Sequence, residues 1–298
     1  MARGHFAKSE SQAASVMKEV QGKGNVIESK GTVRNYETAL KICCDYLKEY
    51  KIGSLRELTP AQAHTYLEIR ASENAQSTID LDRDAIQCMM RHVTHKIKQN
   101  ECLTSAPSKL ETIQKSRSYT PEQVLRVIEY QTERHAISTE ICQKAGLRAH
   151  ELYTLRPIGE IQPSPREVHP NKFSHMPNQT KGYTVTGKGG LIREIRLPTD
   201  LAKRLESRLL DTPKTEIDRK ITYTTYYDIA AGHHFSDAFS KASNRSLGYS
   251  NGAHGLRHSY AQDRYEQLAN YLPRLDVMKC VSQELGHFRP EITEVYLR

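Results

Sequence analysis

Apolar side chains first recur at a helical period after residue 32. They lie alternately three and four residues apart, a spacing that places them on one face of an α-helix. This stripe consists of Val33, Tyr36, Leu40, Cys43, Leu47 and Tyr50. A second helix is predicted from Thr59 to about Ala71, because Thr59-Pro-Ala-Gln is a capping box with proline at the first helical position.

A third helix is predicted from about Thr78 to Lys98. Its inward-facing side chains are expected to be Ile79, Ile86, Met90, Val93 and Ile97. Residues 32–100 should therefore form a small all-helical domain.

The segments that flank this region lack such a period. Residues 1–31 are polar and contain four glycines, so we expect a flexible N-terminal tail with at most one short helix around Ala13–Val20. Residues 101–118 show little periodicity and carry several basic side chains. We predict that they link the helical domain to a second domain over residues 119–298.

The second domain is predicted to be mainly helical with one β-hairpin. Its first helix begins at another capping box, Thr120-Pro-Glu-Gln. Helices are predicted over residues 121–132, 137–145, 199–211, 255–270 and 274–285, with a terminal turn from Pro290. Two β-prone runs flank Gly187-Lys-Gly-Gly and predict the hairpin, after an irregular, proline-containing segment over 155–181. The predicted fold class is therefore α+β, mainly α-helical with a small β-sheet.

Charge indicates the kind of partner. The 298 residues contain 43 Lys and Arg against 35 Asp and Glu, and this net charge of +8 favours a polyanion. Residues 1–117 contain 18 basic against 14 acidic side chains, and residues 118–298 contain 25 against 21. Because the excess is shared, we expect both halves to contact the polyanion.

Composition also indicates the compartment. No apolar run approaches the roughly 18 residues that span a bilayer, and the first residues lack the apolar stretch of a secretion signal. The six cysteines form no Cys-x-x-Cys pair and are expected to be reduced thiols. We therefore expect a cytoplasmic protein with no membrane partner.

Two motifs that suggest other chemistries are incomplete. Residues 182–188 match the start of a phosphate-binding loop, but Gly189 replaces the Ser or Thr that binds magnesium, and a strand follows. His254 and His258 have a spacing found in metal sites, yet the glutamate of a His-Glu-x-x-His motif is absent. The sequence predicts neither a nucleotide cofactor nor a metal ion.

The remaining polar residues predict phosphodiester chemistry. Breaking this bond without a metal ion needs fixed cations around the phosphate, a proton donor for the leaving oxygen and a nucleophile. Arginine binds phosphate through paired hydrogen bonds, histidine and lysine transfer protons, and tyrosine is a nucleophile where cations stabilise its phenolate. The candidates in chain order are Arg148, Glu151 as its ion-pair partner, Lys188 on the hairpin tip, His254, Arg257, His287 and Tyr296.

In this order and at these spacings, the candidates resemble the tyrosine recombinase (phage integrase) family. The most specific parts are His254-Gly-Leu-Arg-His, Leu285-Gly-His and Tyr296, nine residues after His287. The likeness covers nearly the whole chain, because residues 32–98 resemble the family's SAM-like core-binding domain.

The resemblance implies a metal- and ATP-independent reaction. Tyr296 would attack a DNA phosphate to form a 3′-phosphotyrosine, while Lys188 protonates the 5′ oxygen, with Lys181 as the alternative proton donor. The pentacoordinate phosphate would be stabilised by Arg148, Arg257 and His287. His254 would serve in acid/base catalysis, and Glu151 would support Arg148.

The resemblance also implies the biological setting. A homotetramer would act on specific sites in double-stranded DNA through a Holliday junction, with two domains of each subunit around the duplex. This site-specific DNA recombination would integrate or excise a mobile genetic element in the cytoplasm, in association with the nucleoid.

Two alternatives stay open. A type IB topoisomerase shares the chemistry but relaxes supercoils as a monomer; the helical domain ahead of the catalytic half favours the recombinase. A catalytically inactive DNA-binding regulator is the other alternative, and the intact set of candidate residues argues against it.

Overall fold

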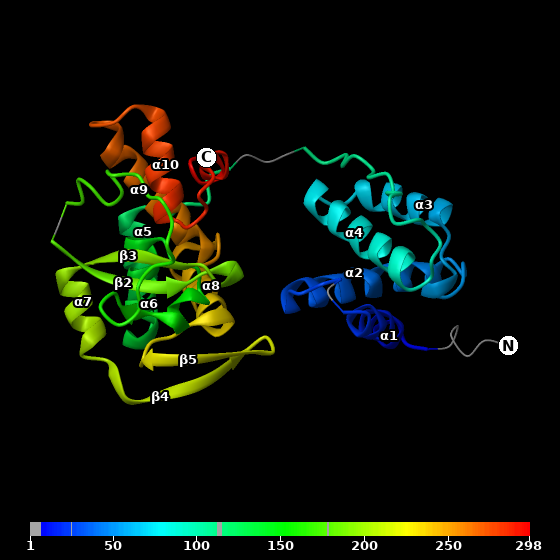
Figure 1. Cartoon of the computed structure of the whole chain (residues 1–298), viewed down its shortest axis with the longest axis horizontal. Helices are drawn as coiled ribbons and strands as arrows, with labels where there is room; N and C mark the ends of the chain where they lie inside the picture. Colours follow the sequence, from blue (N-terminus) through cyan, green and yellow to red (C-terminus); the bar gives the residue numbers. More distant parts are fainter. Residues whose placement is uncertain (1–6, 25, 112–114, 178) are drawn as a thin grey trace. The chain divides into compact units, whose positions relative to one another are not determined.

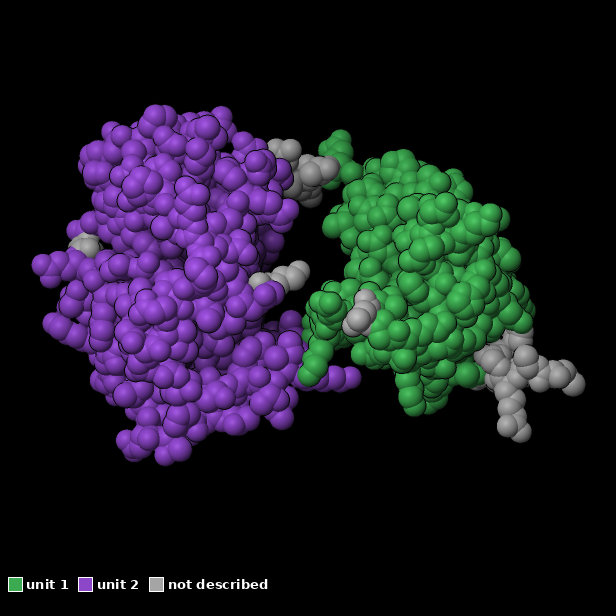
Figure 2. All heavy atoms as spheres, viewed as in Figure 1, with its two compact units in different colours: residues 1–113 green, residues 114–298 purple. Residues whose placement is uncertain are grey.

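The computed structural model describes residues 7–24, 26–111, 115–177 and 179–298. The chain forms two compact units, unit 1 (residues 1–113) and unit 2 (residues 114–298), which Figure 2 shows in different colours. Each unit has an apolar core of its own.

Unit 1 is built from helices (Figure 1). They are α1 (Ser9–Gly22), α2 (Lys30–Glu49), the 3-10 turn η2 (Leu55–Glu57), α3 (Pro60–Ala71) and α4 (Gln76–His92). Helix α2 contacts both α1 and α4, and α3 contacts α4. The predicted stripe on α2 faces this core, where Leu40, Cys43 and Leu47 are fully buried. The capping box predicted at Thr59 is present at the start of α3.

The N-terminal segment differs from the flexible tail that the sequence predicts. Helix α1 is 14 residues long, and four of its apolar side chains are buried in the core of unit 1: Ala13, Val16, Met17 and Val20. These four side chains form an apolar stripe that is too short to predict, from the sequence alone, that the helix packs in a core. Only the apolar face of α2 makes their burial favourable, because most helical stability in proteins comes from packing.

Unit 1 also includes more of the chain than residues 32–100. Helix α4 ends at His92, before the predicted end at Lys98. Further on, Ala106 is buried in the core, and the N–H of Lys109 donates to the carbonyl of Ala71 at 2.8 Å. The first half of the predicted linker therefore packs on α3 and α4.

Unit 2 combines helices with two small antiparallel sheets (Figure 1). Its helices are α5 (Pro121–Glu129), α6 (Glu133–Ala145), α7 (Thr199–Glu206), α8 (Gly232–Leu247), α9 (His254–Ala269), α10 (Arg274–Glu284) and α11 (Pro290–Thr293). Its 3-10 turns are η3 (Glu151–Thr154), η4 (Lys188–Gly190) and η5 (Glu294–Tyr296). One sheet has the order β1 (Arg156–Pro157), β2 (Thr180–Thr186), β3 (Ile192–Pro198); the other pairs β4 (Leu209–Asp218) with β5 (Ile221–Tyr227). The predicted fold class is confirmed.

Helix α6 is the centre of unit 2. It contacts α5, α7, α8, α9 and β3, and even its polar Ser138 and Thr139 are buried. Arg193 of β3 and Arg257 of α9 both donate to the carbonyl of Gly146, so distant parts of the chain meet at the turn after α6.

The predicted hairpin is confirmed. Strands β2 and β3 pair from Thr180↔Pro198 to Thr186↔Ile192, and η4 forms the turn between them. Alternate residues of β3 are buried, including Arg193 in a row with Ile195 and Leu197.

The β4–β5 hairpin was not predicted. The helix predicted to reach residue 211 ends at Glu206, and β4 begins at Leu209. The two-residue turn between β4 and β5 consists of Arg219 and Lys220, with φ values of 50° and 67°. Such turns usually carry Asn or Gly, so the sequence lacks the signal by which hairpins are found.

We predict that α1 is part of the cooperative fold of unit 1. Met17→Ala should lower the free energy of unfolding by about 2–4 kcal/mol, because it leaves a cavity at a side chain that is 2% exposed. Lys18→Ala, an exposed position on the same helix, is the control and should change it by less than about 0.5 kcal/mol. Urea unfolding measures both; equal stabilities of the two variants would contradict the packing of α1.

Candidate active site

The site begins at the C-terminal end of α6. Gly146 ends this helix with a φ of 60°, and an added Cβ would lie 2.6 Å from a ring carbon of Tyr260. Only glycine fits this left-handed, crowded position. The sharp turn directs Arg148 toward the start of η3, where Glu151 lies.

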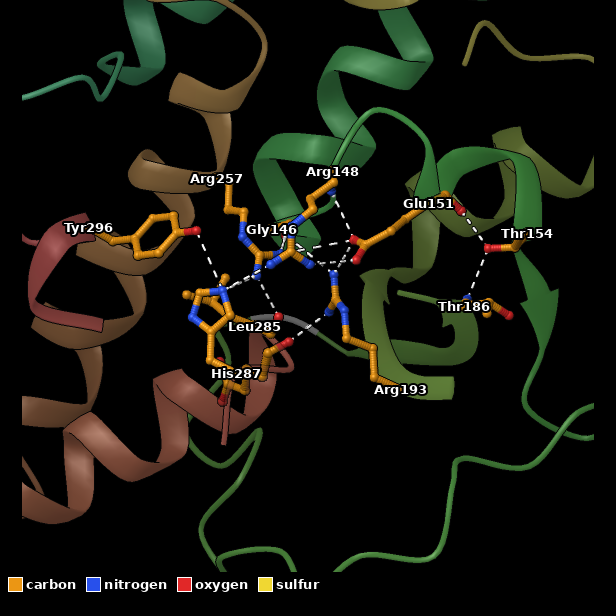
Figure 3. Close-up of polar contacts among 11 residues, drawn as sticks. Gly146, Arg148, Glu151, Thr154, Thr186, Arg193, Arg257, Leu285, His287 and Tyr296 are labelled. Carbon is orange, nitrogen blue, oxygen red and sulfur yellow. Dashed lines mark hydrogen bonds and ion pairs between the residues drawn. The ribbon is translucent and has the colours of Figure 1, made fainter. Parts of the chain in front are cut away.

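The Glu151 carboxylate is fully buried and gathers three guanidinium groups (Figure 3). Its Oε1 accepts from Arg148 Nη1 at 2.9 Å, and its Oε2 accepts from Arg193 Nη2 at 2.7 Å. Oε2 also accepts from the main-chain N–H of Arg148 at 2.9 Å and lies 4.0 Å from Arg257 Nη1. Burial alone would raise the pKa of this carboxyl, but the charges of Arg193, Arg257 and Arg148 outweigh burial and hold the pKa well below its usual range.

Arg257 on α9 is fully buried and joins two helix ends. Its Nη1 donates to the carbonyl of Gly146 after α6, and its Nη2 donates to the carbonyl of Leu285 after α10, each at 2.5 Å. Carbonyls at helix C-termini lack partners within the helix and carry partial negative charge. Burial lowers the pKa of Arg257 to about 10, so the side chain is still charged at neutral pH.

His287 contacts the partly buried Arg148 and the fully buried Arg257. Its Nε2 is 3.0 Å from Arg148 Nη2 and 3.0 Å from Arg257 Nη2. A guanidinium can only donate, so this Nε2 is an acceptor and the ring proton belongs on Nδ1. Burial, followed by the charges of Arg257 and Arg148, lowers the pKa of His287 to about 3. The imidazole is therefore neutral at pH 7.

Tyr296 ends the turn η5 and directs its hydroxyl at His287. The distance from Tyr296 Oη to His287 Nε2 is 3.5 Å, and the Arg257 Cζ atom lies 5.6 Å from the centre of the phenol ring. The tyrosine is 7% exposed. The phenol oxygen and two guanidinium groups thus converge on one imidazole nitrogen (Figure 3).

His254 begins α9 and lies beside the same phenol, with 5.7 Å between ring centres. Burial and the charge of Arg257 lower the pKa of His254 to about 4, so it is also neutral at pH 7.

The main chain at the tip of the β2–β3 hairpin lies beside Glu151. A Cβ added at Gly187 would lie 3.3 Å from Glu151 Oε1, and Gly187 and Gly189 line a pocket of about 500 Å³ together with Arg148 and His287. Lys188 lies between these two glycines; its side chain is outside the described part of the structure. Lys181, the alternative proton donor, lies at the other end of β2, where its Nζ donates to Glu206 Oε1 at 3.0 Å.

Sequence reasoning missed Arg193 and His258. Arg193 is 3% exposed and connects Glu151 to the carbonyls of Gly146 and Glu284. The sequence feature that could have revealed it is its position in β3, where apolar and polar residues alternate and Arg193 falls among the inward-facing residues. His258 packs on the phenol of Tyr296 with 4.6 Å between ring centres, and the His-Gly-Leu-Arg-His motif had already contained it.

Among the described residues, no group of three His, Cys, Asp or Glu side chains is arranged to hold a metal ion. No helix in the part of the chain that the structure describes is long and apolar enough to cross a membrane.

Comparison with known proteins finds no matching family model and no matching curated protein. Solved structures do match. XerH site-specific recombinase bound to difH DNA has a TM-score of 0.61 at 14% identity, with 98% of this chain and 93% of that chain covered. The lambda integrase tetramer bound to a Holliday junction has a TM-score of 0.60 at 16% identity, with 97% and 76% covered. The chain has the tyrosine recombinase fold.

A third structure with this recombinase fold is the Tn1549 transposon integrase in complex with transposon end DNA. It has a TM-score of 0.54 at 15% identity, with 98% of this chain and 95% of that chain covered. The matches extend over both units, so the likeness includes the helical unit 1 as well as the unit that contains Tyr296.

We predict that this recombinase fold depends on the charge of Glu151. Glu151→Gln leaves buried guanidinium groups without a counter-charge and should lower the free energy of unfolding by about 3–5 kcal/mol at pH 7. Because the folded-state pKa of Glu151 is lowered, its contribution is complete above the unfolded pKa of about 4.3 and is lost as the pH falls below it. The difference between wild type and variant should therefore shrink in acid.

The control is Glu160→Gln, which removes a half-exposed partner of Arg156. This surface pair should contribute no more than about 1 kcal/mol. Denaturant unfolding at several pH values measures both variants, and equal losses at the two positions would contradict the role of Glu151.

Proposed function

We propose that this chain is a site-specific DNA recombinase that cleaves and rejoins DNA through a 3′-phosphotyrosine at Tyr296. The carrying observation is the convergence of Arg148, Arg257 and Tyr296 on His287 Nε2, at 3.0, 3.0 and 3.5 Å. A phosphodiester placed there meets fixed cations and a nucleophile within one site.

The two arginines differ in access to the phosphate. The Arg148 side chain is 25% exposed and lines the pocket, whereas Arg257 is fully buried. Arg148 therefore contacts the non-bridging oxygens directly, while Arg257 supplies charge from behind and fixes His287. In this proposal the two arginines bind the phosphate without a metal ion.

In the proposed reaction, Tyr296 Oη bonds to phosphorus as the bond from phosphorus to the 5′ oxygen breaks. His254 lies beside the phenol and is the acid/base partner that takes the phenol proton. His287, whose Nε2 accepts from both guanidinium groups, stabilises the phosphate together with Arg148 and Arg257. Lys188 gives a proton to the 5′ oxygen. The phosphotyrosine bond keeps the energy of the phosphodiester, so rejoining needs no ATP.

The partner in this proposal is double-stranded DNA, and the active assembly is a homotetramer. The net charge of +8 supports a polyanion. The likeness to a lambda integrase tetramer on a Holliday junction and to XerH on its DNA supports strand exchange over relaxation of supercoils. Integration and excision of a mobile element are the reactions we propose.

We predict that wild-type protein becomes covalently attached to DNA and that Tyr296→Phe does not. The probe is a pool of nicked duplexes with a random-sequence core, because a nick lets the cleaved strand leave and traps the phosphotyrosine. Protein-linked DNA is recovered after denaturation and sequenced, with EDTA present. Tyr130→Phe, at an exposed position on unit 2, is the matched control and should be captured like wild type.

Capture of the Tyr296→Phe protein would show that another residue is the nucleophile. Loss of wild-type capture in EDTA would contradict the metal-free reaction.

We predict that Lys188 is the proton donor. Lys188→Ala should slow cleavage of the captured duplex by about 10²–10⁴-fold, the usual contribution of general acid catalysis. A substrate with sulfur in place of the bridging 5′ oxygen should restore the rate, since a thiolate leaves without a proton. Lys181→Ala is the control; if it, and not Lys188→Ala, is rescued by sulfur, the assignment is wrong.

A further inference from the structure

The turn that carries Tyr296 packs on one face of α9. His254, His258 and Gln262 are four residues apart and therefore lie in one row along this helix. The rings of His254 and His258 both contact the phenol. Gln262 Nε2 donates to the main-chain oxygen of Tyr296 at 3.1 Å and to that of Arg298 at 2.9 Å.

A second row on α9 holds residues 115–119, which we call the entry segment because it follows the junction between the two units. A Cβ added at Gly255 would lie 2.5 Å from the carbonyl oxygen of Arg117, so the main chain passes directly over this glycine. Ser259 Oγ accepts from the N–H of Tyr119 and donates to its carbonyl, both at 2.8 Å.

Gln262 belongs to both rows. Its Nε2 also donates to the hydroxyl of Ser116 in the entry segment, at 3.3 Å. An amide group has two N–H bonds, yet three oxygens lie within 3.3 Å of this nitrogen. When Gln262 donates to Ser116, only one of its N–H bonds is left for the two oxygens of the turn that carries Tyr296.

Resting on the proposed function of Tyr296, we propose that Gln262 is a positioning residue that links the entry segment to the nucleophile. When DNA binding to unit 1 shifts the entry segment, Ser116 leaves Gln262, and both amide hydrogens then hold the turn of Tyr296. The nucleophile is in this way fixed most firmly when DNA is present.

The first test is hydrogen exchange of the full chain, followed over residues 290–298. Gln262→Glu keeps the shape but cannot donate, so exchange should rise about fivefold, the effect of losing one net hydrogen bond. Ser116→Ala removes the competing acceptor, so exchange should fall. Random-sequence duplex DNA should slow exchange in wild type and change it little in Ser116→Ala, a coupling that a merely structural residue would not show.

The second test uses the duplex recovered by covalent capture. Gln262→Glu should slow single-turnover cleavage by about fivefold and leave the Kd for this duplex unchanged, whereas Ser116→Ala should cleave at least as fast as wild type. Glu266→Gln, one turn further along α9 and exposed, is the control for both tests.

Opposite effects of Gln262→Glu and Ser116→Ala support the proposal. Unchanged exchange in Gln262→Glu, or faster exchange in Ser116→Ala, would overturn it. Hydrogen exchange can be measured without DNA cleavage. If the protein forms no phosphotyrosine, the proposed function is refuted, and the exchange experiment still decides whether Gln262 couples the entry segment to the turn of Tyr296.

Discussion

The candidate active site depends on one buried carboxylate. Glu151 lies within 4.0 Å of nitrogen atoms from Arg148, Arg193 and Arg257, three like charges that would otherwise repel one another in a place with little water. With this carboxylate present, the three cations are held together in the protein alone. A preorganised site avoids the reorganisation that free side chains would need during the reaction.

The fold contributes helix ends to this arrangement. The carbonyls after α6 and α10 hold Arg257, and the turn after α6 aims Arg148 at the pocket. The same field of guanidinium charge, together with burial, lowers the pKa of His287 and His254 and keeps both rings neutral. The candidate site therefore combines guanidinium groups whose charge Glu151 balances with two neutral imidazoles.

The face of α9 connects this chemistry with the rest of the chain. His254 and His258 contact the phenol of Tyr296, and Arg257 contacts His287. Gln262 contacts both the turn of Tyr296 and the entry segment. A single helix thus contributes to the candidate site and contacts the entry segment, and it is through this helix that we propose binding elsewhere affects the site. Such coupling needs a group with two arrangements, and an amide with two N–H bonds and three acceptors has more than one.

By itself, the sequence determined the helices with long apolar stripes or capping boxes, the β2–β3 hairpin, and the order of residues whose chemistry suits a phosphodiester. These features are local, so spacing and residue type reveal them. Only the tertiary structure decided that α1 is packed, that Arg219 and Lys220 form a hairpin turn, and that Arg193 completes the site. It also placed Gly187, the residue before Lys188, beside Glu151 and paired Lys181 with Glu206. The physical reason is that burial and ion pairing depend on segments far apart in the chain, and periodicity contains no record of which segments meet.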